Sequence, residues 1–259
     1  RVDRYIRSGF ATVLTEMKPL VAGVDAIAHY NLGAIYYHKE PEQSVKWYRL
    51  AAEGGLAEAQ FNLGAIYSNK RGDLRDFRKA AKWYRLAAKQ GIPLAQHNLG
   101  VMHDHGIGIL ENNTTAITWY QLAAEKEYAP AQSNLGVMYA KGEDIAQDYE
   151  AAVRWFRLAA KQGHANTYYN LGVLYEDEAA SLTGKNLAET KLRTSFNWYL
   201  KAAEQGVAEA QFNLGLMYAT GKGAHKNNQH AHAWFNLAGS KGLKLARHYR
   251  MQVEKQLTN

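Results

Sequence analysis

The pattern Ala-x-x-Asn-Leu-Gly-x-x-Tyr recurs six times, with small variations, and constrains the fold of this chain more than any other feature. Its copies occupy residues 28–36, 59–67, 95–103, 131–139, 167–175 and 210–218. A second pattern, Trp-aromatic-x-x-Ala-Ala in its regular form, precedes each copy after the first, and its tryptophan always lies 15 residues before the next asparagine. Successive asparagines are 31, 36, 36, 36 and 43 residues apart. Such a period indicates an array of supersecondary units in which each unit contacts mainly its neighbours.

Both patterns have the spacing of an amphipathic α-helix. The first places Ala59, Leu63 and Tyr67 on one helical face, and the second does the same for Ala80, Tyr84 and Ala88. Each unit is therefore predicted to be two helices, A and then B. The tryptophans at the start of the second pattern are expected to belong to the core between them.

Glycines mark two further positions, one in every unit and one in every unit but the third. A glycine inside helix A, such as Gly64, costs roughly 1 kcal/mol relative to alanine, so we expect helix B to cross closely there. The alanine four residues after each tryptophan is the expected small contact surface, with the aromatic ring beside it. Another glycine lies eight residues after most tryptophans, where a left-handed residue closes a helix. Glu127 takes that place in the third unit, which predicts a different closure.

These patterns predict an all-α chain of six two-helix repeats with a capping helix at each end. The fifth repeat is longer, and its extra residues, at about 176–195, are expected either to add helical turns or to form a loop. The expected divisions are a cap at 1–24, repeats at 25–55, 56–91, 92–127, 128–163, 164–206 and 207–242, and a cap at 243–259.

Composition excludes several classes of site. The chain has 259 residues, a net charge of +7 and no cysteine, so thiolate metal sites and a cysteine nucleophile are excluded. No apolar run of 18 residues and no charged-then-apolar leader is present. The sequence does not determine the localisation, although export is slightly favoured. It also does not determine whether a leader was removed before Arg1. We expect a monomer.

The doubled pattern resembles the Sel-1-like repeat family, a relative of the tetratricopeptide repeats, over roughly residues 25–242. This resemblance implies a right-handed α-solenoid, with A helices on a concave face and B helices on the convex one. It also implies an adaptor role in assembly, signalling or, in bacteria, envelope or host interaction. The resemblance does not identify a ligand.

The predicted partner-binding residues lie on the A helices. In the related tetratricopeptide domains, the residue at the position of the repeated asparagine hydrogen-bonds the backbone or the terminal carboxylate of a bound peptide. In several repeats of this chain an aromatic residue directly precedes the asparagine. Together they predict a groove for a peptide or protein partner. The alternative is that the asparagines bond neighbouring helices and organise the stack. The candidates are Asn31, Asn62, Asn98, Asn134, Asn170 and Asn213, with Tyr30, Phe61, Tyr169 and Phe212.

Two other binding classes remain open. The same four aromatic residues predict, as an alternative function, stacking platforms for a carbohydrate or cell-wall fragment. A basic stripe in the second repeat, formed by Arg78, Lys82, Arg85 and Lys89, is either a solvated convex face or a contact for an acidic partner. Lys70, Arg71 and Arg75 lie close by, and nucleic acid is not the expected partner.

The sequence gives little support for a metal-binding or catalytic site. His97, His103, Asp104 and His105 suggest a metal site, but His97 and His103 replace aromatic residues of the repeat, and His103 and His105 face different sides of a helix. There is no G-x-S-x-G, H-E-x-x-H or phosphate-loop motif. We therefore expect no enzyme, no metal and no cofactor.

Overall fold

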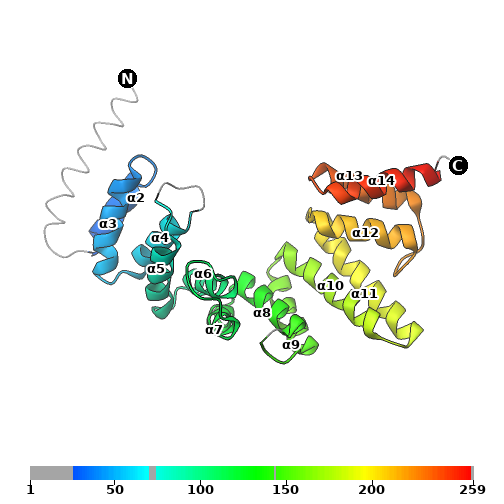
Figure 1. Ribbon diagram of the computed structural model, residues 1–259, viewed down its shortest axis with the longest axis horizontal. Coiled ribbons are helices and arrows are strands. Elements are labelled where there is room, and N and C mark those ends of the chain that lie inside the picture. Colours follow the sequence, from blue (N-terminus) through cyan, green and yellow to red (C-terminus); the bar gives the residue numbers. More distant parts are fainter. Residues whose placement is uncertain (1–25, 70–73, 143, 258–259) are drawn as a thin grey trace, which may run out of the picture. The chain divides into compact units, whose positions relative to one another are not determined.

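The computed structural model describes residues 26–69, 74–142 and 144–257, and every regular element in that range is an α-helix (Figure 1). This confirms the predicted all-α class. The chain divides into two compact units between Lys126 and Glu127, a division that the sequence did not predict. Among the described helices, none is both long and apolar enough to cross a bilayer.

Unit 1 contains three hairpins in chain order. Its described helices are α2 (Ala26–Tyr36), α3 (Pro41–Glu53), α4 (Ala57–Ser68), α5 (Phe77–Lys89), α6 (Pro93–Asp104) and α7 (Asn113–Ala124). Each helix packs against the next one along the chain, so that the A and B helices alternate in a stack.

Unit 2 continues the same alternation with longer helices in its middle. Its helices are α8 (Ala129–Lys141), α9 (Tyr149–Lys161), α10 (Ala165–Ser181), α11 (Lys185–Glu204), α12 (Ala208–Thr220), α13 (Asn228–Ser240) and α14 (Lys244–Leu257). Helix α8 also contacts α10 directly, as expected for successive A helices of a solenoid. Helix α14 buries Ala246 and Val253 against the preceding hairpin, and its role as a cap stays a proposal. The predicted N-terminal cap lies outside the described residues.

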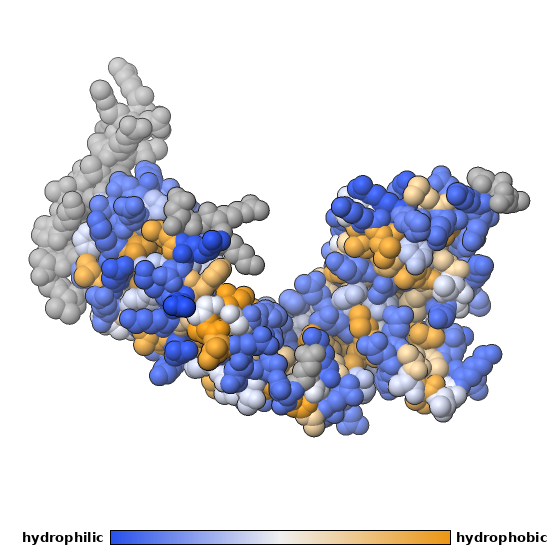
Figure 2. Space-filling model, viewed as in Figure 1, coloured by the Kyte–Doolittle hydropathy of each residue, from blue (hydrophilic) through white to orange (hydrophobic). Residues whose placement is uncertain are grey.

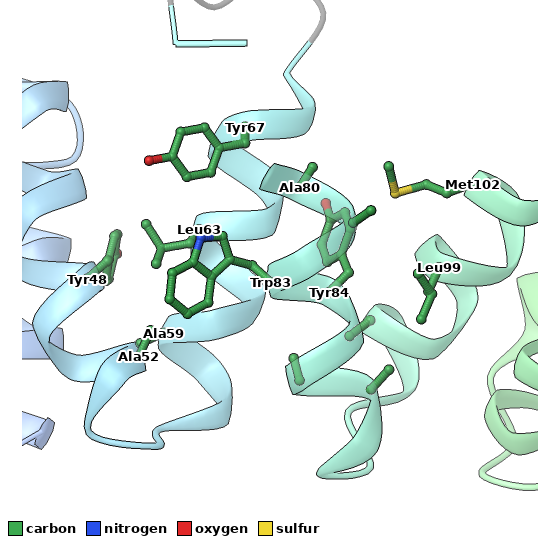
Figure 3. Packing of buried hydrophobic residues seen from close by; sticks show 14 of the residues in the cluster. Tyr48, Ala52, Ala59, Leu63, Tyr67, Ala80, Trp83, Tyr84, Leu99 and Met102 are labelled. Carbon is green, nitrogen blue, oxygen red and sulfur yellow. The ribbon is translucent and has the colours of Figure 1, made fainter. Parts of the chain in front are cut away.

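One hydrophobic cluster runs through α3, α4, α5 and α6 of unit 1 (Figure 3). Tyr48 and Tyr84, one from each B helix, lie beside Leu63 and Leu99 of the A helices, and both leucines are fully buried. Burying a leucine contributes roughly 1.5–3 kcal/mol, and each repeat supplies one at the same position. The core is thus shared between neighbouring repeats, as the sequence period predicts.

The tryptophans are less buried than expected for core residues. Trp83 is buried, whereas Trp47, Trp119, Trp155, Trp198 and Trp234 are only half-buried. The aromatic residue that follows each tryptophan is buried in every repeat. That second aromatic residue, rather than the tryptophan, fills the centre of each hairpin.

The glycine in each A helix faces this buried ring. A Cβ at Gly64 would lie 2.5 Å from Cδ1 of Tyr84, and one at Gly172 would lie 2.4 Å from Cδ1 of Tyr199. The close helix crossing predicted from the sequence is present. The nearest partner surface, however, is the aromatic ring and not the alanine expected there. The same pairing recurs at Gly33, Gly100, Gly136 and Gly215.

The turns that follow the B helices share one backbone conformation. Gly55, Gly91 and Gly206 have φ values of 92°, 90° and 87°, in the left-handed region that glycine tolerates. Glu127 also adopts this conformation, with φ of 60°. The prediction that the third repeat closes differently was therefore wrong: a non-glycine residue occupies the same turn.

The visible surface is largely hydrophilic, with hydrophobic patches over both units (Figure 2). Exposed leucines recur three residues after the tryptophan on α3, α5, α7, α9 and α13. These are Leu50, Leu86, Leu122, Leu158 and Leu237.

The extra residues of the fifth repeat lengthen both of its helices. Helix α10 has 17 residues and α11 has 20, whereas the helices of the second repeat have 12 and 13. The added turns are tied together by Lys191, whose Nζ lies 2.5 Å from Oε1 of Glu178 and 5.4 Å from the centre of the Tyr175 ring. Of the two predicted alternatives, the structure has the added helical turns.

Candidate functional site: the A-helix face

The six repeated asparagines occupy equivalent positions within A helices, and all six are at least partly accessible. Asn31 is exposed, and the other five are half-buried. They are not free side chains, however. Asn62 donates to the Tyr30 hydroxyl across 3.4 Å, and Asn170 donates to the Ser133 hydroxyl across 3.4 Å. Both bonds join successive A helices, so these amides link the stack while keeping part of their surface open.

Two other repeated asparagines, Asn98 and Asn213, influence the pKa of a buried tyrosine in the preceding hairpin. Burial raises the pKa of Tyr84, and hydrogen bonds from Ser68 and Asn98 oppose that rise. Burial likewise raises the pKa of Tyr199, and Asn213 acts in the opposing direction there. The alternative named above, in which the asparagines organise the stack, therefore has support in the structure. Their contact with a partner stays a prediction.

The aromatic residues before the asparagines each pack against a core ring. The ring centres are 5.5 Å apart for Tyr30 and Tyr48, and 5.8 Å apart for both Phe61 with Tyr84 and Tyr169 with Tyr199. Phe212 packs in the same way on Phe235, and also lies edge-on to Tyr249. Each of these half-buried rings therefore has a surface already occupied by protein.

The fourth repeat departs from this arrangement. Ser133 replaces the aromatic residue of the other repeats, so no ring at that position covers Phe156. A pocket of about 470 Å³ lies between α8, α9 and α10, and Phe156 forms part of its wall. The pocket brings together two predicted site residues, Tyr169 and Asn170. Its other lining residues are Val137, Ala140, Lys141, Gln147, Tyr149, Val173, Leu174 and Asp177.

Several of these lining residues could not be found from the repeat pattern. Lys141 and Gln147 lie at or beyond the end of α8, and Tyr149 begins α9, all outside the two signatures. Asp177 follows the signature tyrosine by two residues, in the part of α10 that the extra sequence lengthens. The only available signal was the serine at position 133, which stands where aromatic residues or histidine occur in the other repeats.

Buried glutamines are a second feature that the sequence interpretation missed. Gln60, Gln96 and Gln211 each donate to a backbone carbonyl eight residues earlier, near the end of the preceding B helix, across 3.1 Å. In the fifth repeat the hydroxyl of Tyr168 donates instead to the carbonyl of Ala160 across 3.0 Å. The recurring Ala-Gln pair before the asparagine was the available signal, and its role is structural.

The histidines near the end of α6 do not assemble a metal site. His103 is half-buried, and burial is the main cause that lowers its pKa. The Asp104 carboxylate accepts a hydrogen bond from Tyr120 across 3.1 Å. No group of three or more histidine or acidic residues within the described ranges is arranged to hold a metal ion.

The basic stripe of the second repeat lies on α5. Arg78, Lys82, Arg85 and Lys89 are all exposed, and neighbouring Lys79 pairs with Asp76 across 3.2 Å. Lys70 and Arg71 lie outside the described residues. The stripe is available to solvent, and its contact with an acidic partner stays a prediction.

A solved structure of a bacterial protein shows a similar fold. A Sel1 repeat protein from Oxalobacter formigenes is 32% identical, with a TM-score of 0.72, and the match covers 88% of this chain and 66% of that one. A second structure, a protective antigen of uropathogenic Escherichia coli displaying an SLR fold, is 26% identical, covers 92% and 66% of the two chains, and has a TM-score of 0.38. The chain thus spans slightly less than two thirds of either protein. No curated protein matches it.

The family comparison agrees with the repeats seen in the sequence and the structure. The Sel1 repeat pattern matches six consecutive segments, residues 26–56, 57–92, 93–128, 129–164, 165–207 and 208–243. Together these segments cover most of the 259 residues. The chain therefore belongs to the Sel1 repeat family.

Proposed function

We propose that this chain is a non-enzymatic interaction module that binds a peptide or protein segment on the A-helix face of unit 2. Sel1 repeat proteins generally mediate protein–protein interactions, and their fold is generally a scaffold rather than an enzyme. The observation that carries the proposal is the pocket between α8 and α10, which includes Tyr169 and Asn170. A bacterial setting at the envelope or toward a host is part of the same proposal; the bacterial origin of the similar Oxalobacter protein supports only the bacterial setting.

The chemistry of the pocket suits an extended peptide. Val137, Val173 and Leu174 offer apolar surface, while Asn170 offers an amide group. The amide oxygen of Gln147 is a further acceptor, because its nitrogen donates to the Ala140 carbonyl and the Tyr149 hydroxyl. A few polar groups placed on a mainly apolar wall are typical of sites that bind small ligands and side chains. The asparagines of the other repeats would extend this contact only where their amides can leave their present bonds.

A binding assay with matched asparagine variants tests the proposal. Random linear peptides are selected on the purified chain, and the affinity of the best binders is measured by fluorescence anisotropy. Asn170→Ala should weaken binding about tenfold, because a bound peptide would lose a paired amide in a partly desolvated site. Asn31→Ala is the control, since Asn31 is an exposed asparagine at the same repeat position in unit 1. If the two changes weakened binding equally, or if neither weakened it, the peptide would not bind in this pocket.

The other two binding classes have less support. The four aromatic residues proposed as carbohydrate platforms each pack against a core ring, which occupies part of the surface of each. The basic stripe on α5 is exposed, which an acidic partner would need.

A further inference from the structure

The charges around the pocket of unit 2 are distributed unevenly. Asp177 lines the pocket, is exposed, and forms no salt bridge within the described part of the chain. Glu209, at the start of α12, acts on the neighbouring Tyr169. Burial is the main reason why the pKa of Tyr169 is raised, and the negative charges of Glu209, Glu176 and Asp177 add to that rise. The surroundings of Tyr169 are therefore acidic, although the whole chain carries a net charge of +7.

The opposite side of the pocket carries one positive charge. Lys141 contributes to the lining from the last turn of α8. Three carboxylates near Tyr169 and one ammonium at α8 leave a local negative excess. Of these carboxylates, Glu176 already accepts a hydrogen bond of 2.7 Å from Tyr199, so Asp177 and Glu209 are the two not engaged in this way.

The walls between these charges suit a long side chain with a charged end. The volume of about 470 Å³ lies within the range of sites that hold small ligands, and its floor includes Val137, Val173 and Leu174. Lysine and arginine lay an aliphatic stem along apolar surface while the charged head stays near water. The rings of Tyr149 and Tyr169, which also line the pocket, can each attract a cation.

We propose that this pocket accepts a lysine or arginine side chain of the bound segment, with the cation directed at Asp177. The inference rests on the proposed function and adds the chemical class of the partner: a basic peptide segment. Glu209, on α12, contributes through its charge, which acts on Tyr169. Lys141 disfavours a second cation at the α8 end, which limits the pocket to one basic side chain.

The test begins with the composition of selected peptides. Random linear peptides bound by the wild-type chain should be enriched in arginine and lysine relative to the input library. Selection on the Asp177→Lys variant should lose that enrichment. The affinity of a selected arginine peptide should fall about fivefold for Asp177→Asn, the size expected for a partly exposed ion pair, and should also fall as salt is raised.

Glu178→Gln provides the matched control. Glu178 is the next residue along α10, but it pairs with Lys191 and does not line the pocket. This variant should leave the peptide composition and affinity unchanged. A second comparison exchanges the arginine of the selected peptide for citrulline, which keeps the shape and removes the charge, and should weaken binding to wild type but not to Asp177→Asn.

The outcomes separate this inference from the proposed function. Peptides that bind through Asn170 but show no basic enrichment would overturn the inference and leave the function standing. If the selected peptides were instead enriched in acidic residues, and this enrichment disappeared for Lys141→Met, the inference would be overturned. Lys141 of α8, and not Asp177, would then be the charge that the peptide contacts. Failure of any peptide to bind would overturn both.

Discussion

The second and fifth repeats share the same packing of helix A on helix B, but their helices differ in length. In both, a glycine of helix A faces the ring of helix B, as Gly64 faces Tyr84 and Gly172 faces Tyr199. Both also end with a glycine in the left-handed conformation, Gly91 in one and Gly206 in the other. What differs is the far end of the hairpin, where α10 and α11 extend beyond the length of α4 and α5.

This difference shows which end of a repeat tolerates change. The distance from the tryptophan of helix B to the asparagine of the next helix A is 15 residues throughout, so the link between repeats is fixed. One side chain, the buried Gln60 or the half-buried Tyr168, bonds the preceding B helix across that link. The connection from A to B within a repeat varies in length: the asparagine of helix A and the tryptophan of helix B are 21 residues apart in the second repeat (62 to 83) and 28 in the fifth (170 to 198). The insertion in the fifth repeat is therefore tolerated there, and it places Asp177 in the lining of the pocket.

The largest expected effect comes from removing the shared ring. Tyr84→Ala and Tyr199→Ala should each lower the free energy of unfolding of their unit by about 3–5 kcal/mol, because each leaves a large cavity in a buried cluster. Urea unfolding followed by circular dichroism measures both. A much smaller loss for Tyr199→Ala would mean that the longer helices, and not the glycine–ring contact, hold the fifth repeat together.

A smaller effect is expected from filling the space at the glycine. Gly64→Ala places a Cβ 2.5 Å from the Tyr84 ring, and overpacking of this kind costs about 1–3 kcal/mol, offset by roughly 1 kcal/mol of helix propensity. The net loss of unfolding free energy should be up to about 2 kcal/mol in thermal or urea unfolding.

Gly239→Ala is the matched control for that substitution. The nearest side-chain atom to a Cβ at Gly239 is Cγ of Arg247, at 3.0 Å, on an exposed side chain whose Nε donates to the Gly239 carbonyl across 3.2 Å. The same change should therefore cost less in α13, because an exposed side chain can shift more easily than a buried ring. A loss at Gly239 equal to that at Gly64 would show that helix context, rather than the facing ring, explains the cost.

The features repeated in every unit were the ones that the sequence could predict. Six copies of one pattern fixed the helical hairpins, the close crossing at Gly64 and the glycine turns, because the same constraint acts at each copy. The turn at Glu127 was predicted wrongly, since the surrounding helices can impose a left-handed conformation on a residue that does not favour it. The division after Lys126 left no signal in the repeat pattern.

The candidate site was predicted only in part for the same reason. Tyr169 and Asn170 stand at repeated positions and were found. Asp177, Lys141 and Gln147 line the pocket because helix ends and an insertion place them there, and no period marks such residues. The absence of a ring at Ser133 is visible in the sequence, but its consequence depends on which surface the missing ring would have covered.

The smallest expected effect concerns the turns that only the fifth repeat possesses. Glu178→Gln removes the charge that faces Lys191, and both side chains are about one quarter exposed. Partly exposed ion pairs contribute about 0.5–1 kcal/mol, and salt screens them, so the loss should be of that size at low salt and smaller in 1 M NaCl. Helicity should not change, because the contact of Tyr199 with Gly172 lies elsewhere in the hairpin. A loss of several kcal/mol, or unfolding of α10 in hydrogen exchange, would show that the extra turns support the whole repeat and are not an extension tolerated by a complete hairpin.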